Sequence, residues 1–168
     1  MTVAEAITKS GITPSASYTG IETADDFVFA IQTESTQSKE TDWVVCADHV
    51  KEHSGALNAT TNSDTFIRTG PTDTKSAVQR TLSVTGNRCV GDAFQDFLLS
   101  RKIVFGTGSD VIVPYIYFSL RTGKGEKGTC TLIVTSDAGG SAGSPATFAC
   151  DVKGIGIPDE FDYTAAAG

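Results

Sequence analysis

The chain has 168 residues, of which 39% are hydrophobic and 17 are glycine. This length suits a single domain spanning residues 1–168, and the turn-rich composition favours a mainly β protein over a helical bundle. Its 13 basic and 20 acidic residues give a formal net charge of −7, which excludes a broad basic surface that binds nucleic acid by neutralising phosphates.

The first 20 residues are polar and are interrupted by Pro14 and Gly20. They predict an extended N-terminal arm that becomes ordered on a partner. Glu5 lies early and no apolar run follows it, unlike a secretion signal. The chain also lacks the run of about 20 apolar residues that a membrane span needs. We therefore expect a protein that stays in the cytoplasm, with reduced cysteines and no membrane partner.

Two strands are predicted, at residues 27–32 and 41–47, before a long polar segment. Residues 48–75 lose the alternation of apolar and polar side chains, apart from Phe66 and Ile67. The segment predicts a loop, and loops of this length are generally functional or disordered. It is the best candidate for a contact with another molecule, through Asp48, Lys51, Asn58, Asp64, Phe66, Ile67 and Arg68.

The next segments predict a half-buried strand and one helix. Residues 78–85 alternate, so that one face of the strand is polar and uncharged and consists of Gln79, Thr81, Ser83 and Thr85. The helix is predicted from Asp92 to Lys102, because Asp92 and Gln95 have capping-box spacing and Phe94, Phe97 and Leu98 form one apolar stripe. Such a short helix must dock on a sheet.

Three further strands complete the predicted fold, at residues 111–121, 129–135 and 147–153. In the second of these, Thr129, Thr131 and Thr135 point away from the apolar face. The sum is six or seven strands and one helix, which predicts a mainly β fold, a β-sandwich or half-barrel with a flanking α-helix. We expect the C-terminus, residues 164–168, to be flexible.

Three patterns resemble chemical sites. GxGxxG at residues 123–128 and GxSxG at residues 139–143 are each followed by a strand, whereas the phosphate loop and the nucleophile elbow both need a helix there. Cys46, His49 and His53 have a spacing that can hold zinc, but no second pair of ligands follows. Histidines at the start of a polar loop are the simpler interpretation, so we predict no catalytic site and no cofactor.

The order of elements from about Arg80 to Phe161 is similar to that of a known family. A strand ends at Ser83–Gly86, an amphipathic helix (GDAFQDFLLSRK) follows, then a Tyr-rich strand, a Thr-rich strand and a closing strand with the sequence FACDVKGIGIP. This order resembles the tail tube (major tail) proteins of long-tailed phages and their relatives in contractile tails and tail-like secretion systems.

The resemblance implies a structural virion protein and no enzyme. Its copies would form stacked hexameric rings whose sheets join into one barrel, and DNA would pass through the lumen without specific binding. The neutral faces of residues 79–85 and 129–135 would line the lumen, while residues 48–75 and the termini would contact other copies. Other partners would be the tape measure and terminator proteins, with assembly in the host cytoplasm.

Other functions remain open at this point. Another tail component, such as a tail terminator or a head–tail connector, would have a similar composition. A carbohydrate-binding β-sandwich would use aromatic side chains such as Trp43, Tyr115 and Tyr117, although these lie in strands that look buried. A metal hydrolase would use Cys46, His49 and His53. Pro114 interrupts one long strand, which leaves open which strands line a lumen.

Overall fold

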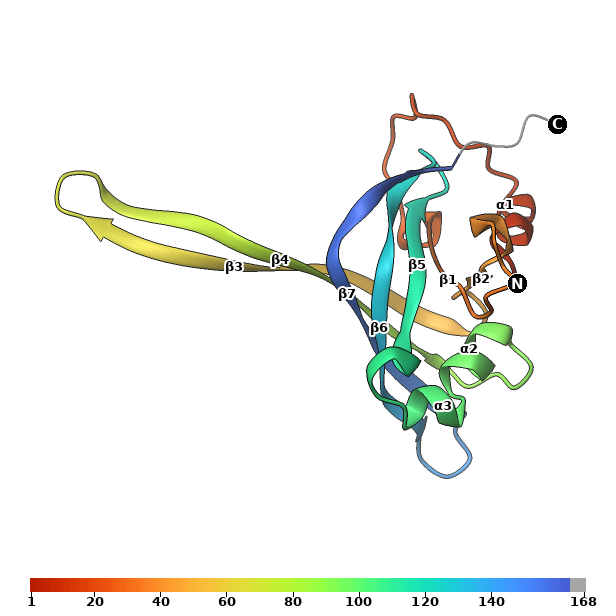
Figure 1. Cartoon of the computed structure of the whole chain (residues 1–168). Helices are drawn as coiled ribbons and strands as arrows, with labels where there is room; N and C mark the ends of the chain where they lie inside the picture. Colours follow the sequence, from red (N-terminus) through yellow and green to blue (C-terminus); the bar gives the residue numbers. More distant parts are fainter. Residues whose placement is uncertain (164–168) are drawn as a thin grey trace.

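In the computed structural model, which describes residues 1–163, seven strands form one open antiparallel sheet in the order β2-β1-β5-β6-β7-β4-β3 (Figure 1). This confirms the predicted mainly β half-barrel. The strands are β1 (Phe27–Ile31), β2 (Val44–Val45), β3 (Val50–Phe66), β4 (Gly70–Asn87), β5 (Ile112–Ser119), β6 (Lys124–Gly139) and β7 (Thr147–Asp162). The helices are α1 (Val3–Ser10), α2 (Ala93–Leu98) and α3 (Arg101–Val104), with 3₁₀ turns η1 (Ala24–Asp26), η2 (Glu40–Asp42) and η3 (Gly108–Val111). The predicted C-terminal flexibility falls on residues outside this range.

The sheet has a separate hydrophobic cluster on each face. On one face, Leu82 and Val84 of β4 pack with neighbouring strands, and Phe94, Leu98 and Ile103 of α2 and α3 cover them. On the other face, β1 and β5 are covered by Val3 of α1 and by Trp43. Strand β7 adds Phe161 to this second cluster near its C-terminal end. The rest of the second cluster lies over β1 and β5, which leaves one face of β4, of the first half of β7 and of the second half of β6 open.

The single helix predicted from Asp92 to Lys102 is two short helices. Its start is confirmed, because Asp92 Oδ2 accepts a hydrogen bond from the backbone N–H of Gln95 at 3.0 Å. However, Ser100 has extended backbone angles (ψ 148°) and occupies the N-cap position of α3, where its side chain accepts no capping hydrogen bond. Serine favours such cap positions over helix interiors. Arg101 and Lys102 thus begin a second helix and do not end the first.

The N-terminal arm was predicted to be extended, and this is wrong for residues 3–10, which form α1. Thr2 Oγ1 accepts from Glu5 N at 3.3 Å, and Glu5 Oε2 accepts from Thr2 N at 2.8 Å. The helix ends at Gly11, in the left-handed region at φ 65°. The buried Val3 fixes α1 to the sheet through a 3.0 Å hydrogen bond to Trp43 O. The Thr-x-x-Glu spacing of a capping box is the sequence signal for this helix.

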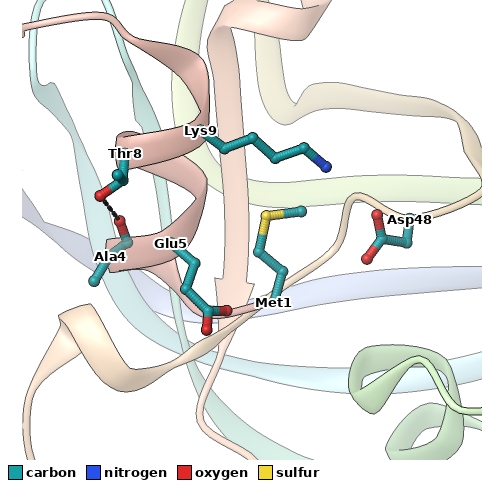
Figure 2. Close-up of a pocket in the computed structure, with 6 residues that line it drawn as sticks. All are labelled: Met1, Ala4, Glu5, Thr8, Lys9 and Asp48. Carbon is teal, nitrogen blue, oxygen red and sulfur yellow. Dashed lines mark hydrogen bonds between the residues drawn. The ribbon is translucent and has the colours of Figure 1, made fainter.

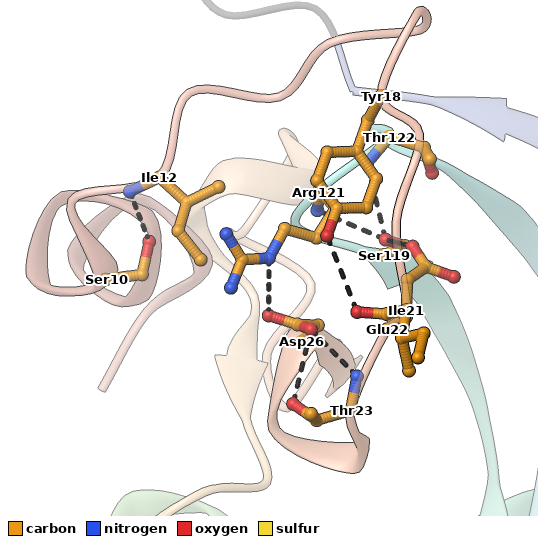
Figure 3. Close-up of polar contacts among 10 residues, drawn as sticks. All are labelled: Ser10, Ile12, Tyr18, Ile21, Glu22, Thr23, Asp26, Ser119, Arg121 and Thr122. Carbon is orange, nitrogen blue, oxygen red and sulfur yellow. Dashed lines mark hydrogen bonds and ion pairs between the residues drawn. The ribbon is translucent and has the colours of Figure 1, made fainter.

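The segment that follows α1 also binds the chain's own sheet (Figure 3). Ser15 N donates to Arg121 O at 2.8 Å, and the Arg121 guanidinium lies 5.7 Å from the centre of the Tyr18 ring. Arg121 Nε in turn donates to Asp26 Oδ1 at 2.8 Å. Residues 11–23 therefore form a strap that lies against the end of β5 in the same chain.

Residues 48–75 are not a loop, which corrects the sequence prediction. Strands β3 and β4 pair continuously from Val50↔Gly86 to Phe66↔Gly70. Within residues 1–163, β4 pairs with β7 only over Thr81–Asn87, so the rest of the hairpin leaves the sheet and projects from it (Figure 1). We call residues 57–80 the ribbon. Both of its faces are mainly exposed, so its sequence lacks the alternation that reveals a half-buried strand.

Candidate assembly surfaces

One face of the sheet is open and polar, and it brings together the predicted lumen residues. Thr81, Lys153 and Thr131 form one cross-strand row over β4, β7 and β6. The predicted residues on this face are Gln79, Thr81, Ser83 and Thr85 of β4 with Thr129 and Thr131 of β6, while Thr135 is exposed beside a register shift of β6. Six of the seven residues thus lie on one face of the sheet, as their alternation predicts, and their place in a lumen stays a prediction.

The open face also carries charged residues and isoleucines, which were not part of the predicted neutral face. Lys153 is exposed in the row of Thr81 and Thr131, and Asp151 lies between Ser83 and Ile133. The Ser83 hydroxyl donates to Asp151 Oδ1 at 2.9 Å. The face is therefore not free of cations, since β7 contributes one of each sign. These residues were missed because β7 was not predicted to lie between β4 and β6.

The ribbon holds most of the predicted contact residues. Asn58 donates to Thr81 Oγ1 at 2.8 Å at its base, and Phe66, Ile67 and Arg68 are at its tip. Phe66 is 54% exposed and Ile67 is fully exposed. Asp64 lies near the tip and Lys51 at an irregularity at the start of β3. Asp48 differs, because its carbonyl is bound by Gln95 Nε2 at 2.9 Å, beneath α2.

Cys46, His49 and His53 are not placed together as a metal site. Within residues 1–163 the structure has no group of three or more His, Cys, Asp or Glu side chains positioned to hold a metal ion. Burial first, and then the neighbouring Cys150, raises the pKa of the Cys46 thiol well above its ordinary value, which disfavours a thiolate ligand. His53 instead packs edge-on against Tyr117, with ring centres 6.2 Å apart. None of the helices in the described residues is long and apolar enough to span a membrane.

A groove of about 720 Å³ runs between α1, β1 and the base of β3. A shallower hollow of about 560 Å³ adjoins it, where Met1, Glu5 and Lys9 face Asp48 across an open space (Figure 2). Lys9, Lys51 and Glu52 are exposed at the rim, whereas Cys46 is buried. The groove therefore combines the border of β3 with a charged rim, which suits a docking surface more than a reaction site.

Comparison with known proteins supports the fold. No protein-family model matches the chain, and no curated protein is similar to it in sequence. The virion of a native gene transfer agent particle contains a chain with a TM-score of 0.56 and 15% identity, the match covering 83% of this chain and 98% of that one. A chain in the tail of an empty gene transfer agent particle with C6 symmetry has a TM-score of 0.57 and 16% identity, covering 85% and 100%. The chain therefore has the fold of a subunit of these particles.

Proposed function

We propose that the chain is a structural tail component, specifically a tail tube subunit whose copies form stacked six-membered rings. The observation that carries this proposal is the ribbon. A two-stranded hairpin is at best marginally stable alone in water, and residues 57–80 gain no strand partner from the sheet in the described part of the chain. Contacts with another copy of the chain would stabilise the ribbon.

The open sheet supports the same role. Strands β2 and β3 form its two borders, and unpaired borders favour association with further strands. Joining copies into a closed ring removes such borders. The C6 symmetry of the gene transfer agent tail belongs to that particle, and a chain with the same fold suits the same arrangement.

The open polar face is suited to line the lumen. Its hydroxyl and amide groups, with the opposite charges of Asp151 and Lys153, give DNA no continuous basic track to bind. The net charge of −7 favours passage over retention. The protein then acts in the virion tail without catalysis, after assembly in the host cytoplasm, with tape measure and terminator proteins as further partners.

The test compares the full chain with a variant whose ribbon is shortened. Replacing residues 61–76 by Asn-Gly joins Thr60 to Ala77, which are directly paired, through a two-residue hairpin turn. We expect rings and tubes of the full chain in negative-stain images, and a folded monomer for the variant by light scattering and circular dichroism. Ser141→Ala with Ser144→Ala, in the exposed turn between β6 and β7, is the matched control and should assemble normally.

Each outcome decides the proposal. Tubes of stacked rings support a tube subunit. Single rings that never stack contradict the tube role and favour a terminator or connector. A full chain that stays monomeric at every concentration contradicts the whole proposal.

A further inference from the structure

The tip of the ribbon is an exposed apolar surface with a positive charge. The tip patch consists of Phe66, Ile67 and Arg68, all of which are exposed. The next charged residues along the ribbon are Asp64, Asp73 and Lys75, and the Ser63 hydroxyl donates to the Asp73 carboxylate. The tip itself therefore presents two large apolar side chains beside one guanidinium.

The outer half of β7 is exposed in a complementary way. Its pairing with β4 ends at Thr81↔Lys153, while its pairing with β6 continues to Lys124↔Asp162. The β6 pairing is interrupted by a bulge of β7 between Ile155 and Asp159, which contains Ile157. From Ile155 to Asp162 the border of β7 that faces away from β6 thus has no partner strand among residues 1–163. We call this segment the β7 border. It carries exposed apolar residues (Ile155 and Ile157, the latter 92% exposed) and exposed carboxylates (Asp159, Glu160 and Asp162), with Lys124 opposite Asp162.

The ribbon is long enough to reach such a border on another molecule. Its ten residues from β3, Leu57–Phe66, extend about 34 Å at about 3.4 Å per residue. A seven-stranded sheet with strands about 4.8 Å apart is about 29 Å wide. In Figure 1 the ribbon and the upper end of β7 diverge within one chain, so the tip lies away from its own β7 border.

We propose that the ribbon tip of one copy binds the β7 border of another copy. This inference rests on the self-assembly proposed above and names the two surfaces that meet. Phe66 and Ile67 would cover Ile155 and Ile157, and Arg68 would face the carboxylates. The border of the incoming hairpin would also hydrogen-bond to the free border of β7, as in recognition by strand addition.

Two features favour this border over Val90, another exposed apolar residue. Val90 is also 83% exposed near acidic residues, but it lies in a turn and Arg88 already pairs with Asp96 there. The β7 border has unpaired backbone as well as apolar and acidic side chains. Pro158 interrupts the donors of β7, which limits strand addition to a short register and disfavours unlimited sheet growth.

Disulfide cross-linking tests the contact directly. The full chain with Cys89→Ala carries Ile67→Cys and Ile157→Cys, and it is allowed to assemble before mild oxidation. A bridge requires Cα atoms roughly 4.4–6.8 Å apart, so we expect a ladder of covalent multimers on non-reducing gels. Ile67→Cys with Val90→Cys is the matched control. A ladder no stronger than that of the control overturns the proposed contact.

Charge reversal gives a second readout that does not depend on a new bond. Arg68→Glu, and separately Asp159→Lys with Glu160→Lys, should each raise the concentration at which assembly begins by about tenfold, and combining them should restore it to within about threefold. Lys75→Glu makes the same charge change farther from the tip and should have little effect. If the two charge reversals raise the assembly concentration additively when combined, with no restoration, the proposed contact is wrong. If the unsubstituted chain assembles in these experiments, the proposed function stands even when the contact fails; if it never assembles, both fail.

Discussion

Arg80 of β4 and Glu126 of β6 form a bidentate ion pair across β7. Arg80 Nε lies 2.6 Å from Glu126 Oε1, and Arg80 Nη2 lies 2.7 Å from Glu126 Oε2. Between them β7 places Gly154, where a Cβ would lie 3.2 Å from Arg80 Cβ. Because Gly154 has no side chain, the side chain of Arg80 can cross β7 and reach Glu126. Because Arg80 is the last ribbon residue before the sheet, the pair fixes the base of the ribbon.

Glu126→Gln should lower the free energy of unfolding by about 1–3 kcal/mol, because it leaves the half-buried guanidinium of Arg80 without its counter-charge. Tyr115, whose hydroxyl donates to Glu126 Oε1 at 3.0 Å, loses a charged acceptor as well. Urea unfolding of the monomer measures the change. Asp110→Asn is the control, because the Lys102–Asp110 pair is 3.9 Å long and exposed, so its loss should cost under about 0.5 kcal/mol. Equal effects of the two substitutions would contradict this assignment.

Gln95→Met should lower the free energy of unfolding by about 3 kcal/mol, because the buried amide of Gln95 makes hydrogen bonds to three backbone groups. Its Oε1 accepts from Cys89 N at 2.7 Å, and its Nε2 donates to Asp48 O at 2.9 Å and Asn87 O at 3.2 Å. Thermal or urea unfolding measures the loss.

Gln79→Met is the matched control for that substitution. Gln79 is exposed and makes a single 3.3 Å hydrogen bond to Gly154 O, so its replacement should cost less than about 1 kcal/mol. A loss for Gln95→Met no greater than that of the control would show that water replaces the buried amide.

The parts of the fold that the sequence predicted are those with one buried face. Alternation placed Leu82 and Val84 in the core and Thr81 and Ser83 outside it, and the stripe of Phe94 and Leu98 docks as expected. The ribbon was missed because a strand exposed on both faces has no such alternation. In α1, Val3, Ala6 and Ile7 have helical spacing and pack on the sheet, so this stripe and the Thr2–Glu5 capping box were both signals that the sequence prediction overlooked.

The candidate surfaces depend on pairings between distant segments, which a single sequence does not reveal. Lys153 and Asp151 were absent from the predicted face because β7 pairs with both β4 and β6. The β7 border exists only because β4 pairs with β7 from Thr81 to Asn87, while the preceding residues of β4 lie in the ribbon. The sequence around Gly154 and Gly156 was part of the family pattern. Only the packed strands show that Gly154 leaves room for the Arg80 side chain to reach Glu126.

Asp26→Asn should destabilise the protein more at pH 6 than near pH 3. The backbone N–H of Thr23 first, and then Arg121, hold the pKa of Asp26 below its ordinary value of 3.8. A native pKa below the unfolded one adds stability above the unfolded value, and this stability is lost as the pH falls through the native pKa. Urea midpoints of the monomer at the two pH values test the difference. Asp137→Asn, at an exposed site, is the control, and an Asp26→Asn effect that is the same at both pH values would contradict the prediction.

The four cysteines should differ sharply in their reactivity towards a disulfide reagent such as DTNB at pH 8. Cys46, Cys130 and Cys150 are buried, while Cys89 is partly exposed. Burial raises the pKa of Cys150 from its ordinary value of 9.0 to about 12 and raises the pKa of Cys46 and Cys130 as well. Because the thiolate is the reactive form, these three should react at least about a hundredfold more slowly than Cys89.

We expect one rapidly labelled thiol in the folded protein, four after unfolding in urea, and none that is rapid in Cys89→Ala. The same assay addresses the metal interpretation of Cys46, His49 and His53. A zinc-bound Cys46 would be a thiolate, so stripping the metal with a chelator would expose a second rapid thiol. A buried, protonated Cys46 should give identical labelling with and without zinc. Rapid labelling of Cys46 that zinc suppresses would contradict this structural role and support the metal site.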